Sequence, residues 1–217
     1  MKLFSPDSKF MQAMSRIADL VIINVMYVIC CLPVFTIGAA TTALYTVCSK
    51  MVYNDDAKLY RTFFRSFKEN FGQSTVLWLI YLLTGAVLAV DIYFFSQIPK
   101  PAAYIGILFC TFMALLFMVA SYTFPLLCHF ENTKLTTVKN ALMMSLAYLP
   151  RTILIVIINL LPFFLLIYDF MMFLQTGFIW FFLYFSAAAY MNSMLLKKVF
   201  RPYLGDGKEE ETEEDGE

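Results

Sequence analysis

Charged residues are scarce in this chain of 217 residues, since Asp, Glu, Lys and Arg make up only 15% of it. An average soluble domain is about 25% charged and about half apolar. This chain is instead 60% hydrophobic and 18% aromatic, with a mean hydropathy of +0.70. The balance excludes a soluble globule and an intrinsically disordered chain, and it indicates an integral membrane protein.

Residues that carry metal, redox and nucleotide chemistry are also scarce. His129 is the only histidine, and the five cysteines form no C-x-x-C pair, which argues against a zinc site, a redox motif and a disulfide scaffold. The sequence has no G-x-x-x-x-G-K-[ST], G-x-G-x-x-G, H-E-x-x-H or G-x-S-x-G motif. We therefore expect no catalytic residue, cofactor or metal, and no enzymatic activity.

The charges are divided unevenly along the chain. Half of the 16 acidic residues lie after Leu204, where Lys208 is the only base, so residues 1–204 carry a net positive charge. We expect residues 1–204 to form a single transmembrane domain and residues 205–217 an acidic disordered tail. A basic body suits an anionic inner leaflet or an acidic partner. Nucleic acid is not expected, because the bases are spread among apolar runs.

A membrane span needs about 20 apolar residues, and four runs satisfy this: 74–96, 102–130, 152–174 and 178–196. Residues 17–53 form either one span with an extension or two short spans, 17–32 and 39–53. The positive-inside rule favours two short spans in this region. A total of six spans places 15 basic residues inside and only Lys100 outside, whereas a total of five spans leaves four basic residues outside. We predict an all-α bundle of six spans in three hairpins, with both termini cytoplasmic; five spans are the alternative. Many alanines and threonines in 39–53 favour close helix packing over lipid contact.

Two cytoplasmic connectors are predicted to be amphipathic helices. In residues 57–72 aromatic and basic side chains occupy opposite faces, and the candidate docking residues are Arg61, Phe63, Phe64, Arg65, Phe67, Lys68 and Phe71. This helix can lie in the lipid headgroup region or dock a cytoplasmic protein. The second connector has a leucine-rich face from Leu135 to Leu149, with Asn132 or Thr133 as its N-cap.

Ionisable side chains within spans are candidates for function. Asp91 and Asp169 lie near the outer ends of two spans, and together with Lys100 and Gln175 they define a candidate outer polar site. Hydration at the membrane interface, or an ion pair with Lys100, accounts for the same residues. Interhelical hydrogen bonding is the expected role of three asparagines within spans: Asn24, Asn159 and Asn192.

Three motifs carry a resemblance to a known family. They are L-P-x-x-T-I-G at residues 32–38, A-x-x-A-L-Y at 40–45 and F-x-x-x-F-K-x-N-F at 63–71. In these motifs the chain resembles the YesL-like family of bacterial membrane proteins, a domain of unknown function. The resemblance implies a multi-pass protein of the bacterial plasma membrane, of a kind often found beside polysaccharide-degradation and carbohydrate ABC-uptake systems. It carries over no catalytic residues.

These observations lead to two functional hypotheses. The first is a non-enzymatic accessory component of ABC-type carbohydrate uptake or polysaccharide utilisation, which contacts transporter subunits through the connectors or the acidic tail. The second is a self-contained small transporter or channel that uses Asp91 and Asp169. The lipid bilayer is an expected contact in both hypotheses, and a homo-oligomer is compatible with either.

Overall fold

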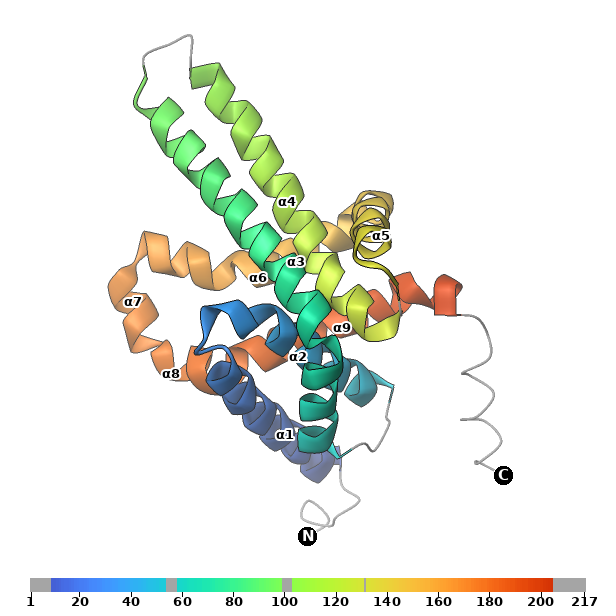
Figure 1. Cartoon of the computed structure of the whole chain (residues 1–217). Helices are drawn as coiled ribbons and strands as arrows, with labels where there is room; N and C mark the ends of the chain where they lie inside the picture. Colours follow the sequence, from blue (N-terminus) through green and yellow to red (C-terminus); the bar gives the residue numbers. More distant parts are fainter. Residues whose placement is uncertain (1–8, 54–57, 99–102, 131, 205–217) are drawn as a thin grey trace.

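The computed structural model describes residues 9–53, 58–98, 103–130 and 132–204, and every element within these ranges is helical (Figure 1). The α-helices are α1 (Lys9–Cys30), α2 (Ile37–Val52), α3 (Leu59–Ser96), α4 (Ala103–His129), α5 (Lys134–Ala147), α6 (Leu149–Tyr168), α7 (Phe170–Gln175), α8 (Gly177–Ile179) and α9 (Phe185–Leu204). A 3-10 turn, η1 (Val34–Thr36), precedes α2, and a π-helical segment, η2 (Trp180–Tyr184), precedes α9. The predicted all-α class is confirmed.

The protein has several helices that can cross a membrane. Four stretches are long and apolar enough: Phe10–Cys30, Leu59–Ser96, Tyr104–His129 and Gly177–Phe200. The helices α5 and α6, bent by 107° at their junction, count as a fifth span if the pair is taken together. With 16 residues, α2 is roughly 24 Å long, short of a hydrocarbon core of about 30 Å. The chain is a multi-pass membrane protein, and the six-span topology stays a prediction.

Two predicted boundaries differ from the structure. The first connector, of which residue 57 lies outside the described residues, is not a separate helix, because it runs from Leu59 directly into the following span as the 38-residue α3. No proline interrupts this stretch, and its inward face packs on α2 along both parts, so nothing ends the helix at Gly72. The predicted span 152–174 ends at Tyr168, because Asp169 adopts an extended backbone and starts α7.

The short helix α2 forms the centre of the fold, and α3, α4, α9 and α1 pack around it. Eleven of its 16 residues are buried, among them Gly38, Ala39, Ala40 and Ala43. A Cβ atom at Gly38 would lie 2.5 Å from the carbonyl oxygen of Ser74. Small side chains therefore allow α2 and α3 to approach closely, which confirms the packing predicted for this segment.

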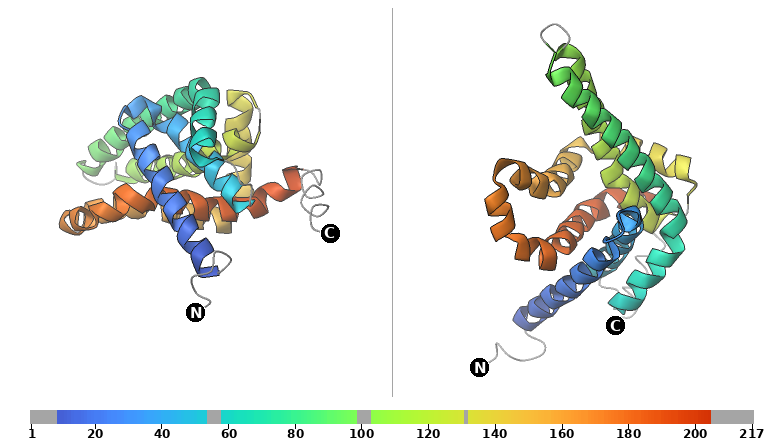
Figure 2. Two further views of the ribbon diagram at one scale, coloured as in Figure 1. Left: turned by 90° about the horizontal axis from the view of Figure 1, so that it is seen from below. Right: turned by 60° about the vertical axis from the view of Figure 1, so that its left-hand side comes forward.

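Two parts of the chain extend from this centre. The far ends of α3 and α4 form a long hairpin that reaches beyond the other helices (Figures 1 and 2). The helices α6, α7 and α8 form an arch that returns the chain to α9 (Figure 2, right). The hairpin and the arch therefore place the predicted outer ends of the spans on different parts of the molecule.

Candidate functional site

The residues of the predicted outer polar site lie on separate elements. Asp91 is half-buried near the end of α3, in the extended hairpin, whereas Asp169 and Gln175 are exposed at the two ends of α7, in the arch. Lys100 lies outside the described residues. Asp169 has a structural role, because its Oδ1 accepts a hydrogen bond of 3.0 Å from the backbone N–H of Met172 and so caps α7. The arrangement does not bring Asp91 and Asp169 into one site.

The beginning of α3 carries the predicted docking residues on two different faces. Phe63 is fully buried and Phe67 packs against the core, with their rings stacked 6.5 Å apart. Arg61, Phe64, Arg65, Lys68 and Phe71 are exposed, as is the neighbouring Tyr60. The aromatic face thus divides into an inner part that attaches the helix to the bundle and an outer part that faces away from it.

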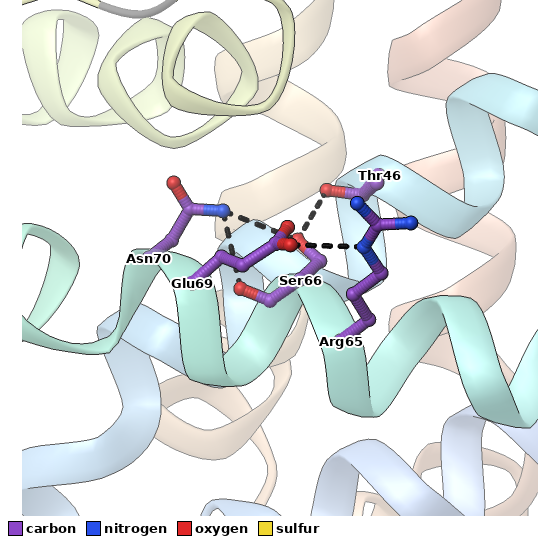
Figure 3. A network of polar contacts seen from close by, with 5 residues as sticks. All are labelled: Thr46, Arg65, Ser66, Glu69 and Asn70. Atoms are coloured by element: carbon purple, nitrogen blue, oxygen red, sulfur yellow. Dashed lines mark hydrogen bonds and ion pairs between the residues drawn. The ribbon is translucent and has the colours of Figure 1, made fainter.

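Polar contacts fix the inner face of this segment to α2. Ser66 Oγ lies 2.7 Å from Thr46 Oγ1, and Asn70 Nδ2 donates to the carbonyl oxygen of Ser66 at 3.1 Å (Figure 3). On the outer side, Arg65 Nε donates to Glu69 Oε1 at 2.9 Å. An exposed pair one turn apart contributes little to stability, so Arg65 can exchange this contact for one with a partner at little cost.

The second predicted connector corresponds to α5, which Thr133 caps through a hydrogen bond of 3.4 Å from the N–H of Thr136. Its packed face is not the leucine-rich one. The buried residues are Thr137, Ala141, Met144 and Ser145, and α5 packs mainly against α4. The leucine-rich face points outward, and Leu135 is 85% exposed. Such a face suits contact with acyl chains at the membrane interface.

The fully buried Asn24 joins α1 to the π-helical segment η2. Its Nδ2 donates to the carbonyl oxygens of Phe181 at 2.7 Å and Trp180 at 3.3 Å, and its Oδ1 accepts from the N–H of Ser186 at 2.8 Å. In a regular α-helix this N–H would donate to the carbonyl four residues earlier. Asn24 therefore satisfies backbone groups that the π-turn displaces, as the prediction of an interhelical role requires.

The other two interior asparagines connect four helices. Asn159 Nδ2 on α6 donates to Ser121 Oγ on α4 at 3.4 Å. Asn192 Nδ2 on α9 donates to Asn159 Oδ1 at 2.9 Å and to Tyr45 Oη on α2 at 3.0 Å. These bonds confirm the interhelical role predicted for both residues. Asn192 Oδ1 is buried and has no hydrogen-bond partner.

A cavity of about 100 Å³ adjoins this chain of hydrogen bonds. Its polar lining comes from four elements, with the remaining wall apolar: Tyr27 on α1, Thr41 and Tyr45 on α2, Asn159 on α6 and Tyr184 on η2. No motif or charge in the sequence marks these hydroxyl groups as neighbours. The signal available was the spacing of Thr41 and Tyr45, which places both on one face of the small-residue helix.

Acidic and metal-ligating residues do not gather in the described parts of the chain. Within residues 9–53, 58–98, 103–130 and 132–204, no group of three or more His, Cys, Asp or Glu is placed to hold a metal ion. The single histidine, His129, instead contacts Ser49 through Nε2 at 2.9 Å and packs against the ring of Phe200. The polar chemistry of the described interior is therefore that of amide and hydroxyl groups.

Comparison with known proteins identifies relatives over most of the chain. The family model described as "Protein of unknown function, DUF624" matches residues 20–92. The uncharacterized protein YteU of Bacillus subtilis (strain 168) is 32% identical over 168 residues, which cover 74% of this chain and 72% of YteU. The uncharacterized protein YesL of the same organism is 29% identical over 117 residues, covering 54% of this chain and 55% of YesL. No solved structure gives a significant match. The three sequence motifs and these relatives agree: the chain belongs to the YesL-like family of membrane proteins of unknown function, DUF624.

Proposed function

We propose that this protein is a non-enzymatic accessory membrane component of carbohydrate uptake of the ABC type or of polysaccharide utilisation. In this proposal the beginning of α3 is the docking element for another subunit. One observation carries the proposal: this segment is held to the bundle by buried aromatic side chains and presents a separate basic and aromatic surface outward. The carbohydrate context comes from the family resemblance.

The physical support is a preorganised surface. Phe63 and Phe67 anchor the segment, so a partner need not order a free helix on binding, and association costs less entropy. The exposed side chains are Arg61, Arg65, Lys68, Tyr60 and Phe64. Arginine and tyrosine are enriched among the residues that dominate binding energy at protein interfaces. The basic character suits an acidic subunit surface, and it also suits the anionic inner leaflet.

The absence of a nucleotide-binding motif in the sequence fits an accessory role, because ATP hydrolysis would then reside in another chain. The proposal places both termini and the beginning of α3 in the cytoplasm, where an ATPase subunit of an ABC transporter lies. It requires a contact between chains and no reaction on this one. A second copy of the chain is a further partner that the same experiment would detect.

The test is affinity purification from native membranes in a mild detergent, after growth on a complex polysaccharide. The variant replaces Arg61, Phe64 and Lys68 with alanine, because these side chains are exposed. Its thermal unfolding midpoint checks the loss of the edge contact of 5.7 Å between the rings of Phe64 and the buried Phe63. Phe63 is unsuitable, since its loss would create a cavity. The matched control replaces Lys134 and Lys139 on α5, which removes two exposed positive charges elsewhere.

We expect transporter subunits to co-purify in a fixed ratio with the wild type and with the control, and to be lost from the α3 variant. Equal recovery with both variants would reject α3 as the docking element. Purification of the chain alone would reject the accessory role and favour a self-contained transporter. Such a transporter would have to use a polar path other than one joining Asp91 and Asp169, because these lie on separate parts of the fold.

A further inference from the structure

The cavity between α1, α2, α6, η2 and α9 has the composition of a binding site. Its lining combines aromatic rings and small apolar residues with hydroxyl groups from Tyr27, Thr41, Tyr45 and Tyr184 and the amide of Asn159. Ligand sites in proteins are largely apolar, with a few polar groups that fix orientation. In helical bundles they form between facing helices.

The lining restricts the charge of a ligand. None of the ten described residues around the cavity is Asp, Glu, Lys, Arg or His. A charged molecule would lose its hydration without gaining an opposite charge, which is costly in a membrane interior. The cavity therefore favours an uncharged ligand.

The hydrogen-bonding groups of the cavity restrict the chemistry of the ligand further. Asn192 holds two lining residues, Tyr45 and Asn159, through its Nδ2, while its Oδ1 is buried without a donor. Hydroxyl groups can both donate and accept hydrogen bonds. The hydroxyl groups of Thr41 and Tyr184 donate to the carbonyl oxygens of Ile37 and Ile158. They therefore offer a ligand acceptor lone pairs, which suit a molecule that brings O–H groups.

The local backbone also differs from a regular helix at this position. Tyr184 is the last residue of η2, and Pro162, which also lines the cavity, lies within α6. Short π-helical segments occur frequently at functional sites, and Asn24 holds this one in place from α1. A regular α-helix at this position would satisfy its own backbone hydrogen bonds. The protein instead keeps an irregular segment whose backbone groups need Asn24 as a partner.

The cavity is open on one side, so its volume limits the part of a ligand that enters it. A dry apolar cavity of about 150 Å³ can bind benzene, and this cavity measures about 100 Å³. We propose that the cavity binds an uncharged, hydroxyl-bearing compound of about the size of glycerol, or the hydroxyl-bearing end of a longer one. This site is independent of the docking surface on α3, so either proposal can fail without the other.

The test uses the full chain in phospholipid nanodiscs, prepared without glycerol or sugar-based detergent. Glycerol and benzene, which are of similar size, serve as the polar and apolar probes, and saturation-transfer NMR measures their contact with the protein. Ala188→Leu fills the cavity from α9. Ala86→Leu adds the same side chain at an exposed position on α3 and serves as the control.

Tyr27→Phe is the second variant, because it removes one hydroxyl group and keeps the ring that packs 5.5 Å from that of Phe185. The Tyr27 hydroxyl makes a long contact of 3.4 Å to Thr41 Oγ1 and a weak one to the Cys31 thiol, so the fold loses little. The thermal unfolding midpoint shows whether Ala188→Leu folds. If it does not, Tyr27→Phe still tests the proposal.

We expect the wild type and Ala86→Leu to show the same glycerol signal, and Ala188→Leu to lose the part of the signal that depends on the protein. Tyr27→Phe should bind glycerol about tenfold more weakly, which corresponds to the loss of roughly one hydrogen bond. The bilayer contribution is equal in all four samples and cancels in the comparison. A glycerol signal that Ala188→Leu and Tyr27→Phe leave unchanged would overturn the proposal. So would a benzene signal that depends on the cavity while the glycerol signal does not.

Discussion

The contact between Asn24 and η2 allows a direct test of how the fold maintains its π-helical segment. The substitution Asn24→Val removes both the donor and the acceptor of this amide and leaves an apolar side chain of similar size. The carbonyl oxygens of Trp180 and Phe181 each lose one donor, and the N–H of Ser186 loses its acceptor. The two carbonyl groups belong to η2, and the N–H of Ser186 lies in the first turn of α9, directly after it.

The expected destabilisation follows from these three bonds. Interhelical side-chain hydrogen bonds in membrane proteins contribute about 0.6 kcal/mol on average and at most about 1.7 kcal/mol each. A buried donor left without an acceptor costs about 1–3 kcal/mol, and this applies to the N–H of Ser186. We expect Asn24→Val to lower the free energy of unfolding by about 2–4 kcal/mol.

The assay is equilibrium unfolding by SDS in mixed micelles, followed by far-ultraviolet circular dichroism. Asn140→Val is the matched control, because Asn140 is a half-buried asparagine on α5, away from η2. We expect the control to change the free energy of unfolding by less than about 0.5 kcal/mol, as for a surface substitution. The difference between the two variants isolates the contribution of the Asn24 contact from the general effect of removing an amide.

A change of less than about 0.5 kcal/mol for Asn24→Val would refute the reasoning. It would mean that residues 180–186 convert to a regular α-helix when Asn24 is absent and recover their hydrogen bonds within the chain. The Asn24 contact would then be a consequence of the π-turn and not its support.

Three further predictions concern packing, the interior amides and topology. Gly38→Ala should lower the free energy of unfolding by about 1–3 kcal/mol in the same assay, because the new Cβ would lie 2.5 Å from the carbonyl oxygen of Ser74 and 2.6 Å from Trp78 Cβ. Gly72→Ala is the control and should raise the free energy of unfolding slightly, because nothing lies within 4 Å of its new Cβ. Equal effects of the two substitutions would contradict the close approach of α2 and α3. Asn192→Leu should lower the free energy of unfolding by about 1–3 kcal/mol in SDS titration, because it removes two hydrogen bonds and leaves Asn159 Oδ1 without this donor. A change of less than about 0.5 kcal/mol would contradict the role of Asn192 in joining the helices. In a cysteine-free background, Lys100→Cys should react with an impermeant maleimide added to intact cells and Lys2→Cys should not; reaction at Lys2→Cys would favour five spans over six.

Much of the helical architecture could be predicted from hydropathy, because the bilayer restricts the backbone to self-satisfied segments. The runs that became α1, most of α3, α4 and α9 are continuous and apolar. The least regular parts were predicted with the wrong bounds. Residues 57–72 were treated as separate because the charge pattern changes at Gly72, yet no helix-ending signal occurs there, and α3 continues through it. Conversely, the apolar run 152–174 concealed the end of α6 at Tyr168.

Candidate sites were harder to predict, because periodicity shows which residues share a helix face and not which element packs against that face. The face of Tyr60, Phe63, Phe64 and Phe67 was a single pattern in the sequence, but packing against α2 buries only part of it. On α5 the periodicity marks only the leucine-rich face, whereas Thr137 and Ser145 lie on the buried face. In a membrane, leucine gains nothing by leaving lipid, so small and hydroxylated residues mark the helix contacts.

The sequence by itself determined that the chain is a helical membrane protein, that its second apolar segment packs closely, and that its asparagines join helices. These properties follow from local composition and from the cost of unpaired polar groups in hydrocarbon. Only the tertiary structure decided that Asp91 and Asp169 lie apart and that Tyr27, Tyr45 and Asn159 line one cavity. The contacts between distant residues depend on how the helices bend, cross and align. In this protein the close approach of α2 and α3 at Gly38 and the π-turn before α9 set that geometry. The hydropathy of a single segment encodes neither feature.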